Sequence, residues 1–356
     1  MERKRLNLIL YSAAALLVII VLAVWFTAFS LPAEPVQEEN EVDVEETESD
    51  LPKIESSNES LFDGQEIKAN KERSLAVIIE NHTEARRQQA GLSEASLVFE
   101  AEAEGGITRF LAFYPYQNTE KVGPVRSARP YTVRWAEMFD SAFAHAGGSE
   151  MGFNTIYNSG RILDLDGLAL EGGQKYFTRD YLYYAPHNLF TNLAELRELA
   201  EDKGWDREIS DPVFEFGSSL DNDEDADLAD TIRIYYPWPQ YYVRYEYDSE
   251  NSVYKRYQAG EAHIDKNTGD QITPSNVIVM ITNYYPTDEE GRLYMKTEGQ
   301  GDMYLFRNGK VFPGTWERYT TSDVLKFYGE DGKELVFEKG PTWISVVNQT
   351  AGMQWE

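Results

Sequence analysis

The strongest constraint on this chain is an apolar run near its N-terminus. Residues 6–29 are interrupted by only three polar side chains, and three basic residues stand before them at positions 3–5. About 20 apolar residues are enough for one helix to cross a bilayer. Because positive charge favours the cytoplasmic side, the run predicts a transmembrane anchor over residues 1–30, with the rest of the chain outside the cytoplasm. A cleavable signal peptide is the alternative, although its apolar core usually spans only about 7–15 residues.

The segment after this run is strongly acidic. Residues 34–66 hold thirteen Asp or Glu side chains against one Lys, with few bulky apolar residues. Such a composition cannot bury enough apolar surface to order itself, so residues 31–73 are predicted to form a disordered tether. The whole chain carries a formal net charge of -28. Nucleic acid is therefore excluded as a partner, because phosphate binding needs a basic face.

The sequence contains no cysteine, which excludes disulfides, a thiolate nucleophile and a lipid-modified cysteine. The fold must therefore be stabilised by its core. About 290 residues follow the acidic segment, more than one small core usually holds. Two domains are predicted, at residues 74–217 and 231–350. An acidic linker, residues 218–230, is predicted between them because six of its last ten residues are acidic.

The predicted fold class is α+β, with a mixed α/β first domain and a mainly β second domain. In the first domain, β-branched and aromatic residues predict strands at 75–81, 96–103 and 108–115. Helices are predicted at 131–140, after a proline, and at 192–204, where Asn192 is a suitable N-cap. The second domain contains short strand-like runs separated by turns, and Asn308-Gly309 and Asp331-Gly332 are strong hairpin signals.

Several motifs carry a family resemblance. They are AEGGITRFLAFY, KVGPVRSARPY, AHAGGS, APHNLFTN, NGKVFPGTWER and GPTWISVV, and they span about residues 74–348. In these motifs the chain resembles the YerB-like family of Gram-positive envelope proteins, which has a two-part domain of unknown function. The resemblance implies an extracytoplasmic location but no established activity. A lipoprotein anchor, as in that family, is not possible without a cysteine, so the transmembrane segment would replace it.

A weaker similarity links the chain to the LytR-CpsA-Psr family. Those membrane-anchored enzymes transfer glycopolymers from a polyprenyl carrier to the cell wall. KVGPVRSARPY stands where that family has its arginine motif, and AHAGG where it has a glycine pair. The family's arginine motif normally continues into a metal-binding aspartate, whereas Ser127 and Ala128 follow Arg126 here. The resemblance therefore implies a transferase fold without the expected magnesium ligand, and whether the chain is an enzyme stays open.

Arginines are the first candidates for a binding site. Arg126 and Arg129 lie three residues apart between prolines, and a guanidinium group suits carboxylate or phosphate. Arg109 and Arg179 are possible partners in the same pocket. The alternative is a structural ion-pair network with Glu100, Glu102 or Glu104, since buried ion pairs occur without any ligand.

A second set of candidates surrounds a glycine pair. The candidates are His145, Gly147, Gly148, Ser149 and His187. Successive glycine and serine amides before a helix can form an anion-binding nest, and an imidazole can exchange protons near neutral pH. The alternative is that the histidines are hydrogen-bonded core residues. No metal-ligand spacing is present, so neither a metal nor a cofactor is predicted.

A tyrosine-rich stretch, residues 235–247, could stack sugar rings or receive a peptide, although aromatic residues are also common in ordinary strands. Alternation predicts that Tyr241, Val243, Tyr245 and Tyr247 share one face. Together the patterns predict a membrane-anchored envelope protein that binds an anionic or glycan ligand through an arginine-lined pocket. Cell-wall glycan, a polyprenyl phosphate or another envelope protein are the predicted partners besides the membrane. The alternative is a glycopolymer or polyprenyl-phosphate transferase.

Overall fold

The structure is a computed structural model that describes residues 59–67, 74–170, 175–205, 213–217, 226–348 and 352–356. The predicted anchor and most of the predicted tether lie outside these residues. Within the described ranges, no helix is long and apolar enough to cross a bilayer. Residues 56–356 belong to one compact unit.

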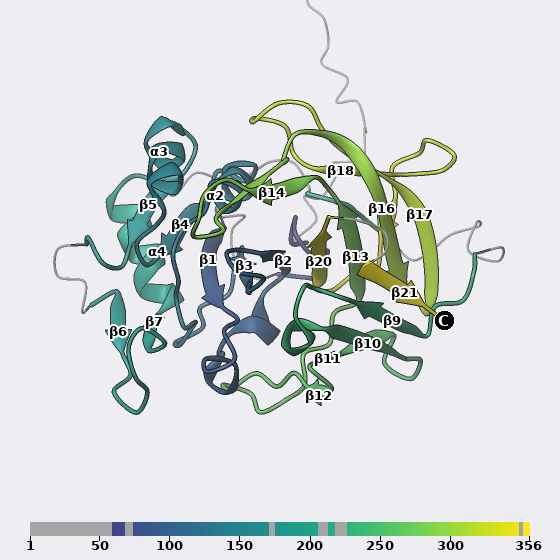
Figure 1. Ribbon diagram of the computed structural model, residues 1–356, viewed down its shortest axis with the longest axis horizontal. Helices are drawn as coiled ribbons and strands as arrows, with labels where there is room; N and C mark the ends of the chain where they lie inside the picture. Colours follow the sequence, from purple (N-terminus) through teal and green to yellow (C-terminus); the bar gives the residue numbers. More distant parts are fainter. Residues whose placement is uncertain (1–58, 68–73, 171–174, 206–212, 218–225, 349–351) are drawn as a thin grey trace, which may run out of the picture. The chain divides into compact units, whose positions relative to one another are not determined.

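The first half of this unit mixes strands and helices, as predicted (Figure 1). Its strands are β1 (Leu75–Glu80), β2 (Leu97–Glu102), β3 (Thr108–Tyr114), β4 (Ala142–His145), β5 (Leu163–Asp166), β6 (Phe177–Arg179), β7 (Leu189–Thr191) and β8 (Glu215–Phe216). Its α-helices are α2 (Pro130–Glu137), α3 (Glu150–Asn158) and α4 (Leu193–Asp202). Helix α4 begins where predicted, because the side chain of Asn192 accepts hydrogen bonds from the amides of Ala194 and Glu195 at 2.9 and 3.2 Å.

The second half is mainly β, and no α-helix occurs among its described residues, 226–348 and 352–356. Its strands are β9 (Thr231–Ile234), β10 (Val243–Asp248), β11 (Val253–Gln258), β12 (Glu261–Ala262), β13 (Asn276–Ile281), β14 (Tyr284–Pro286), β15 (Leu293–Met295), β16 (Gly299–Arg307), β17 (Lys310–Arg318), β18 (Lys326–Gly329), β19 (Val336–Phe337), β20 (Thr342–Val347) and β21 (Met353–Trp355). Asn308 and Gly309 join β16 to β17 with φ angles of 51° and 69°, as expected for a tight hairpin.

A single ten-stranded sheet runs through both halves. Its order is β18-β17-β16-β13-β20-β2-β3-β1-β4-β5, and β20 pairs in parallel with both β13 and β2. A second sheet of five strands has the order β12-β11-β10-β9-β21. The predicted boundary near residue 218 therefore divides the sequence, but the two stretches share one sheet in space.

Alternating side chains of the large sheet pack into different cores. On β1, Ile78 joins the core that contains Trp135 of α2, whereas Val77 and Ile79 join the core that contains Leu193 and Leu196 of α4. Toward the other end, β13 contributes to a third core, which packs against the five-stranded sheet. One face of the sheet is thus covered by α2, and the opposite face by α4 at one end and by the smaller sheet at the other.

Two predicted boundaries need correction. The predicted tether extends too far, because Phe62 is only 1% exposed and packs on Phe113 and Phe139. The predicted linker also extends too far, because the amide of Ala229 donates to the carbonyl of Gly309 at 2.8 Å. In both segments a few apolar residues are buried in the core. The free energy gained by this burial outweighs the tendency of the acidic residues around them to stay in solvent.

Candidate functional site

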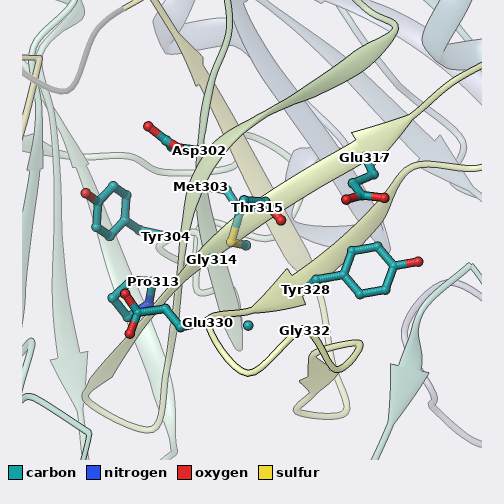
Figure 2. Close-up of a pocket in the computed structure, with 11 residues that line it drawn as sticks. Asp302, Met303, Tyr304, Pro313, Gly314, Thr315, Glu317, Tyr328, Glu330 and Gly332 are labelled. Atoms are coloured by element: carbon teal, nitrogen blue, oxygen red, sulfur yellow. The ribbon is translucent and has the colours of Figure 1, made fainter.

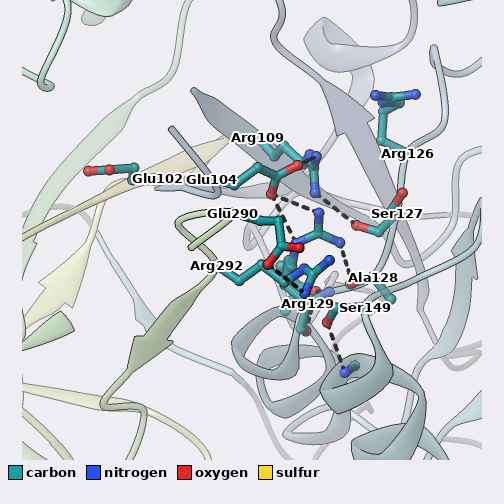
Figure 3. A network of polar contacts seen from close by, with 12 residues as sticks. Glu102, Glu104, Arg109, Arg126, Ser127, Ala128, Arg129, Ser149, Glu290 and Arg292 are labelled. Carbon is teal, nitrogen blue, oxygen red and sulfur yellow. Dashed lines mark hydrogen bonds and ion pairs between the residues drawn. The ribbon is translucent and has the colours of Figure 1, made fainter. Parts of the chain in front are cut away.

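Two of the candidate arginines converge on one carboxylate. Arg109 on β3 forms an ion pair with Glu104, and Arg129, the residue before α2, contacts Glu104 Oε2 through Nε at 3.0 Å and through a terminal nitrogen at 2.7 Å. Figure 3 shows Glu104 between the two guanidinium groups. Arg109 also donates to the carbonyl of Ser127 at 3.3 Å. These contacts form a structural network of the kind that the sequence left as the alternative.

The electrostatics of this trio are those of a satisfied ion-pair hub. Burial alone would raise the pKa of Glu104, but Arg109 and then Arg129 hold that pKa below its ordinary value. Burial, followed by the charge of Arg109, lowers the pKa of Arg129, and Glu104 partly offsets that change. Since each guanidinium already faces a carboxylate, neither arginine is free to receive an external anion without giving up an internal one.

Arg126 is arranged differently. It lies apart from the other two arginines (Figure 3), and its side chain is 23% exposed. Its Nε lies 3.1 Å from Glu80 Oε1 at the end of β1, but this nitrogen is not aligned for a hydrogen bond with any described residue. Of the three neighbouring arginines, Arg126 is therefore the one whose side chain is partly exposed to solvent, because those of Arg109 and Arg129 are buried.

Glu80 connects Arg126 to a cluster of histidines. The carboxylate is 3% exposed, and its Oε1 lies 2.9 Å from Nδ1 of His187. The other ring nitrogen of His187, Nε2, lies 3.2 Å from Glu84 Oε2. The ring of His82 stacks on His187, with centroids 5.0 Å apart and an interplanar angle of 17°. One ligand atom from each of His82, Glu84 and His187 falls within 4.8 Å of the others.

The glycine pair is engaged within the protein. His145 is fully buried, with Nδ1 2.8 Å from the carbonyl oxygen of Gly147 and Nε2 2.7 Å from Asp164 Oδ1. The amide of Gly147 donates to Asp166 Oδ1 at 2.8 Å, and that of Ser149 to a backbone carbonyl at 3.3 Å. The Ser149 hydroxyl caps α3 by accepting from Gly152. These contacts make His145 a hydrogen-bonded core residue and occupy two of the amides of the predicted nest, next to Gly148.

The side chain of Arg179 forms a hydrogen bond within its own hairpin. This residue ends β6 and donates to the side-chain oxygen of Asn188 at 2.9 Å. In the tyrosine-rich stretch, Tyr241, Val243 and Tyr245 are buried on one side, as the alternation predicts, and Tyr247 is half-buried. The exposed Trp238 donates its indole N–H to the carbonyl of Gly105 at 2.8 Å, so part of this stretch covers the β2–β3 turn.

A depression of about 590 Å³ lies over β16, β17 and β18, away from the candidate arginines. Figure 2 shows the carboxylates of Asp302, Glu317 and Glu330 around it. Neither Arg nor Lys is among the described residues that line it. Its charge therefore disfavours an anionic ligand.

Sequence reasoning missed Glu80, His82 and Glu84. All three belong to the stretch ENHTE at the end of β1, and alternate acidic and imidazole side chains at a strand end are the only local signal. Their partner His187 comes 105 residues after His82, so the proximity depends on the pairing of distant segments.

Comparisons with known proteins agree with the fold and the motifs. Residues 63–206 match the model described as "Protein of unknown function (DUF3048) N-terminal domain", and residues 232–344 match the corresponding C-terminal domain. The chain is 34% identical over 286 residues to "Putative lipoprotein YerB" of Bacillus subtilis (strain 168), covering 79% of this chain and 83% of that protein. It is also similar to the crystal structure of YerB protein from Bacillus subtilis, with a TM-score of 0.74, 32% identity and coverage of 84% of this chain and 99% of that chain. The chain therefore belongs to the DUF3048 family and, as its motifs predicted, is a YerB-like protein.

Proposed function

We propose that this chain is a membrane-anchored protein of the cell envelope, whose folded part lies outside the cytoplasm and binds an anionic lipid-linked ligand. The printed name of YerB describes a lipoprotein, which supports a membrane location for a relative that shares the fold. This chain has no cysteine to carry a lipid. The apolar run at residues 6–29 supplies the anchor instead, and the basic residues before it orient the chain.

The binding site that we propose is narrower than the arginine pocket expected from the sequence. Arg109 and Arg129 share Glu104 and are buried, whereas the side chain of Arg126 is partly exposed to solvent. The single observation that carries the proposal is that Arg126 lies next to His187 and Leu189, at the base of a loop between β6 and β7 that exposes large apolar side chains. A guanidinium together with apolar side chains on a nearby loop suits a phosphate that carries a hydrocarbon chain.

The loop is linked to Arg126 by backbone and side-chain contacts. The amide of Val125 donates to the carbonyl of Leu189 at 2.7 Å, and His187 shares the carboxylate of Glu80 with Arg126. The loop then presents three large apolar side chains that are 84–90% exposed, namely Tyr181, Leu182 and Tyr184. Such exposure is unusual for large apolar side chains and indicates an interaction surface.

Binding of farnesyl phosphate, a short polyprenyl phosphate, tests this proposal. The full-length chain is held in detergent micelles and titrated calorimetrically with farnesyl phosphate, with farnesol as the uncharged comparison. Arg126→Lys keeps the positive charge beside Glu80 but loses the planar fork, so we expect at least a tenfold weaker affinity with a nearly unchanged melting temperature. Arg292→Ala, at an exposed arginine on another loop, is the control and should bind as the wild type does.

Two results would count against this site. Equal affinity for farnesyl phosphate and farnesol would mean that charge is not recognised. Equal affinity of the wild type and Arg126→Lys would place any binding elsewhere. A double variant, Leu182→Ser and Tyr184→Ser, separates the two parts of the site, because it should weaken farnesyl phosphate while leaving the weak binding of inorganic phosphate unchanged.

A further inference from the structure

The structure also points to a cation site beside Arg126. We propose that His82, Glu84 and His187 bind one divalent transition-metal ion of the zinc class. The proposal needs no envelope ligand, because it rests on side chains at the end of β1 and on His187, near the end of the β6–β7 loop.

The distances fit a shared ion. Ligand atoms held at about 2.0–2.1 Å from one zinc ion lie roughly 3.3 Å apart in a tetrahedron, and Nε2 of His187 lies 3.2 Å from Glu84 Oε2. A ligand atom of His82 is within 4.8 Å of both. The Glu84 side chain is 71% exposed and His82 is half-buried. The exposure of these two side chains leaves room for the rotations that would close the remaining gap.

The ligand types select the class of metal. Two imidazoles and one carboxylate suit zinc and its neighbours in the first transition series, whereas magnesium and calcium prefer oxygen ligands alone. Three protein ligands leave a fourth position open to water. The exposure of Glu84 provides a route of entry from solvent.

Glu80 gives the cluster the support that bound histidines usually have. A histidine that ligates a metal through one nitrogen commonly donates the other N–H to a carboxylate, which orients the ring. Nδ1 of His187 lies 2.9 Å from Glu80 Oε1, so Nε2 is the nitrogen directed at Glu84. Three buried polar atoms here have no hydrogen-bond partner among the described residues: Glu80 Oε2, Arg126 Nε and His187 Nδ1. A slight turn of His187 toward a bound ion would align its N–H on Glu80.

The contacts that a metal ion would replace are weak. The amide of Glu84 donates to Nδ1 of His82 at 3.3 Å in an exposed position. This bond is lost whichever ring nitrogen ligates the ion, because a neutral imidazole has only one lone pair to share. The competing arrangement is His187 between Glu80 and Glu84 without a metal ion.

Zinc titration distinguishes the two arrangements. The full-length chain in detergent micelles is stripped with a chelator and titrated with zinc alone by calorimetry, and cobalt is substituted to record the absorption bands of a histidine-bound ion. We expect one zinc ion per chain. His187→Gln should abolish binding, Glu84→Gln should weaken it by at least tenfold, and Glu80→Gln should weaken it by about 10–100-fold, as losses in the outer shell do.

The control variant is Glu289→Gln, which removes the same charge from an exposed position on another loop and should bind zinc as the wild type does. Weak binding by the acidic N-terminal segment is common to all variants and cancels in the comparison. If His187→Gln unfolds, Glu84→Gln still tests the proposal, because an exposed side chain can be replaced without disturbing the core. Absence of zinc binding by the wild type, or equal binding by the wild type and Glu84→Gln, would overturn the proposal.

Discussion

Breaking the buried ion pair between Glu100 and Arg256 should unfold the protein at a much lower temperature. Glu100 lies on β2 and Arg256 on β11, so the pair joins the ten-stranded sheet to the five-stranded one. The atoms Glu100 Oε2 and Arg256 Nη2 are 2.6 Å apart, and both side chains are fully buried. Burial alone would lower the pKa of Arg256, but Glu100 raises it above its ordinary value, so the charged pair is the favoured state.

The expected magnitude follows from the cost of a lone buried charge. Glu100→Gln leaves the Arg256 guanidinium buried without its counter-ion, which costs about 3–5 kcal/mol. A domain of about 150–250 residues loses roughly 2–4 °C of melting temperature per kcal/mol. Since this unit is larger, the lower figure of about 2 °C per kcal/mol applies. We therefore expect the melting temperature to fall by about 6–10 °C. Arg256→Met should cost a similar amount, because it strands the carboxylate.

The double variant, Glu100→Gln with Arg256→Met, should be more stable than the sum of the two single losses implies, because neither charge is then left alone. Urea unfolding followed by tryptophan fluorescence measures all three free energies. Glu198→Gln is the control, because Glu198 forms an exposed ion pair with Lys175. It should have the same melting temperature as the wild type. Losses below about 1 kcal/mol for both single variants, the range of a surface pair, would refute the argument.

Further predictions concern neighbouring positions. Burial raises the pKa of Glu102, so its ionised form opposes folding. Glu102→Gln should therefore raise the free energy of unfolding at pH 7. This gain should vanish below about pH 4, where the carboxyl of Glu102 is protonated in the unfolded chain as well. The pKa of Glu104 is lowered, so Glu104→Gln should reduce stability above about pH 5. The difference from the wild type should disappear as the pH falls through the lowered pKa. Chemical unfolding of the Glu102 and Glu104 variants across this pH range measures both effects. Gly123→Ala should lower the melting temperature, because the glycine has φ of 146° and a Cβ atom would lie 2.9 Å from the carbonyl oxygen of Leu189; a wild-type melting curve would contradict this. A fragment that ends at residue 217 should not unfold cooperatively in circular dichroism, because β2 would lose β20; a sharp transition would show that the first half folds alone.

Local signals in the sequence were enough to find individual elements. Asn192 identifies the start of α4, and the pair Asn308-Gly309 identifies the β16–β17 hairpin, because each signal acts over a few residues. Strand β20 was recognised only as part of a family motif. Its partners, β2 and β13, lie far from it in the sequence, so its place between them could not be predicted from local signals.

Partners in the candidate site could not be predicted in the same way. Arg109, Arg126 and Arg129 are alike as sequence features, yet two of them face Glu104 and the third faces Glu80. Glu100, which the sequence offered as a partner for these arginines, instead pairs with Arg256 from the second half. The choice depends on sheet register and on segments more than a hundred residues apart, which a single sequence does not reveal.

The central place of β20 determines when the protein can finish folding during synthesis. Every other strand of the ten-stranded sheet precedes β20 in chain order. A growing chain therefore presents β2 and β13 with open edges until the ribosome has made residues 342–347. Open strand edges are sites of misassociation. The nascent chain consequently stays incompletely folded until late, and a truncated translation product lacking β20 is expected to be degraded by quality-control proteases.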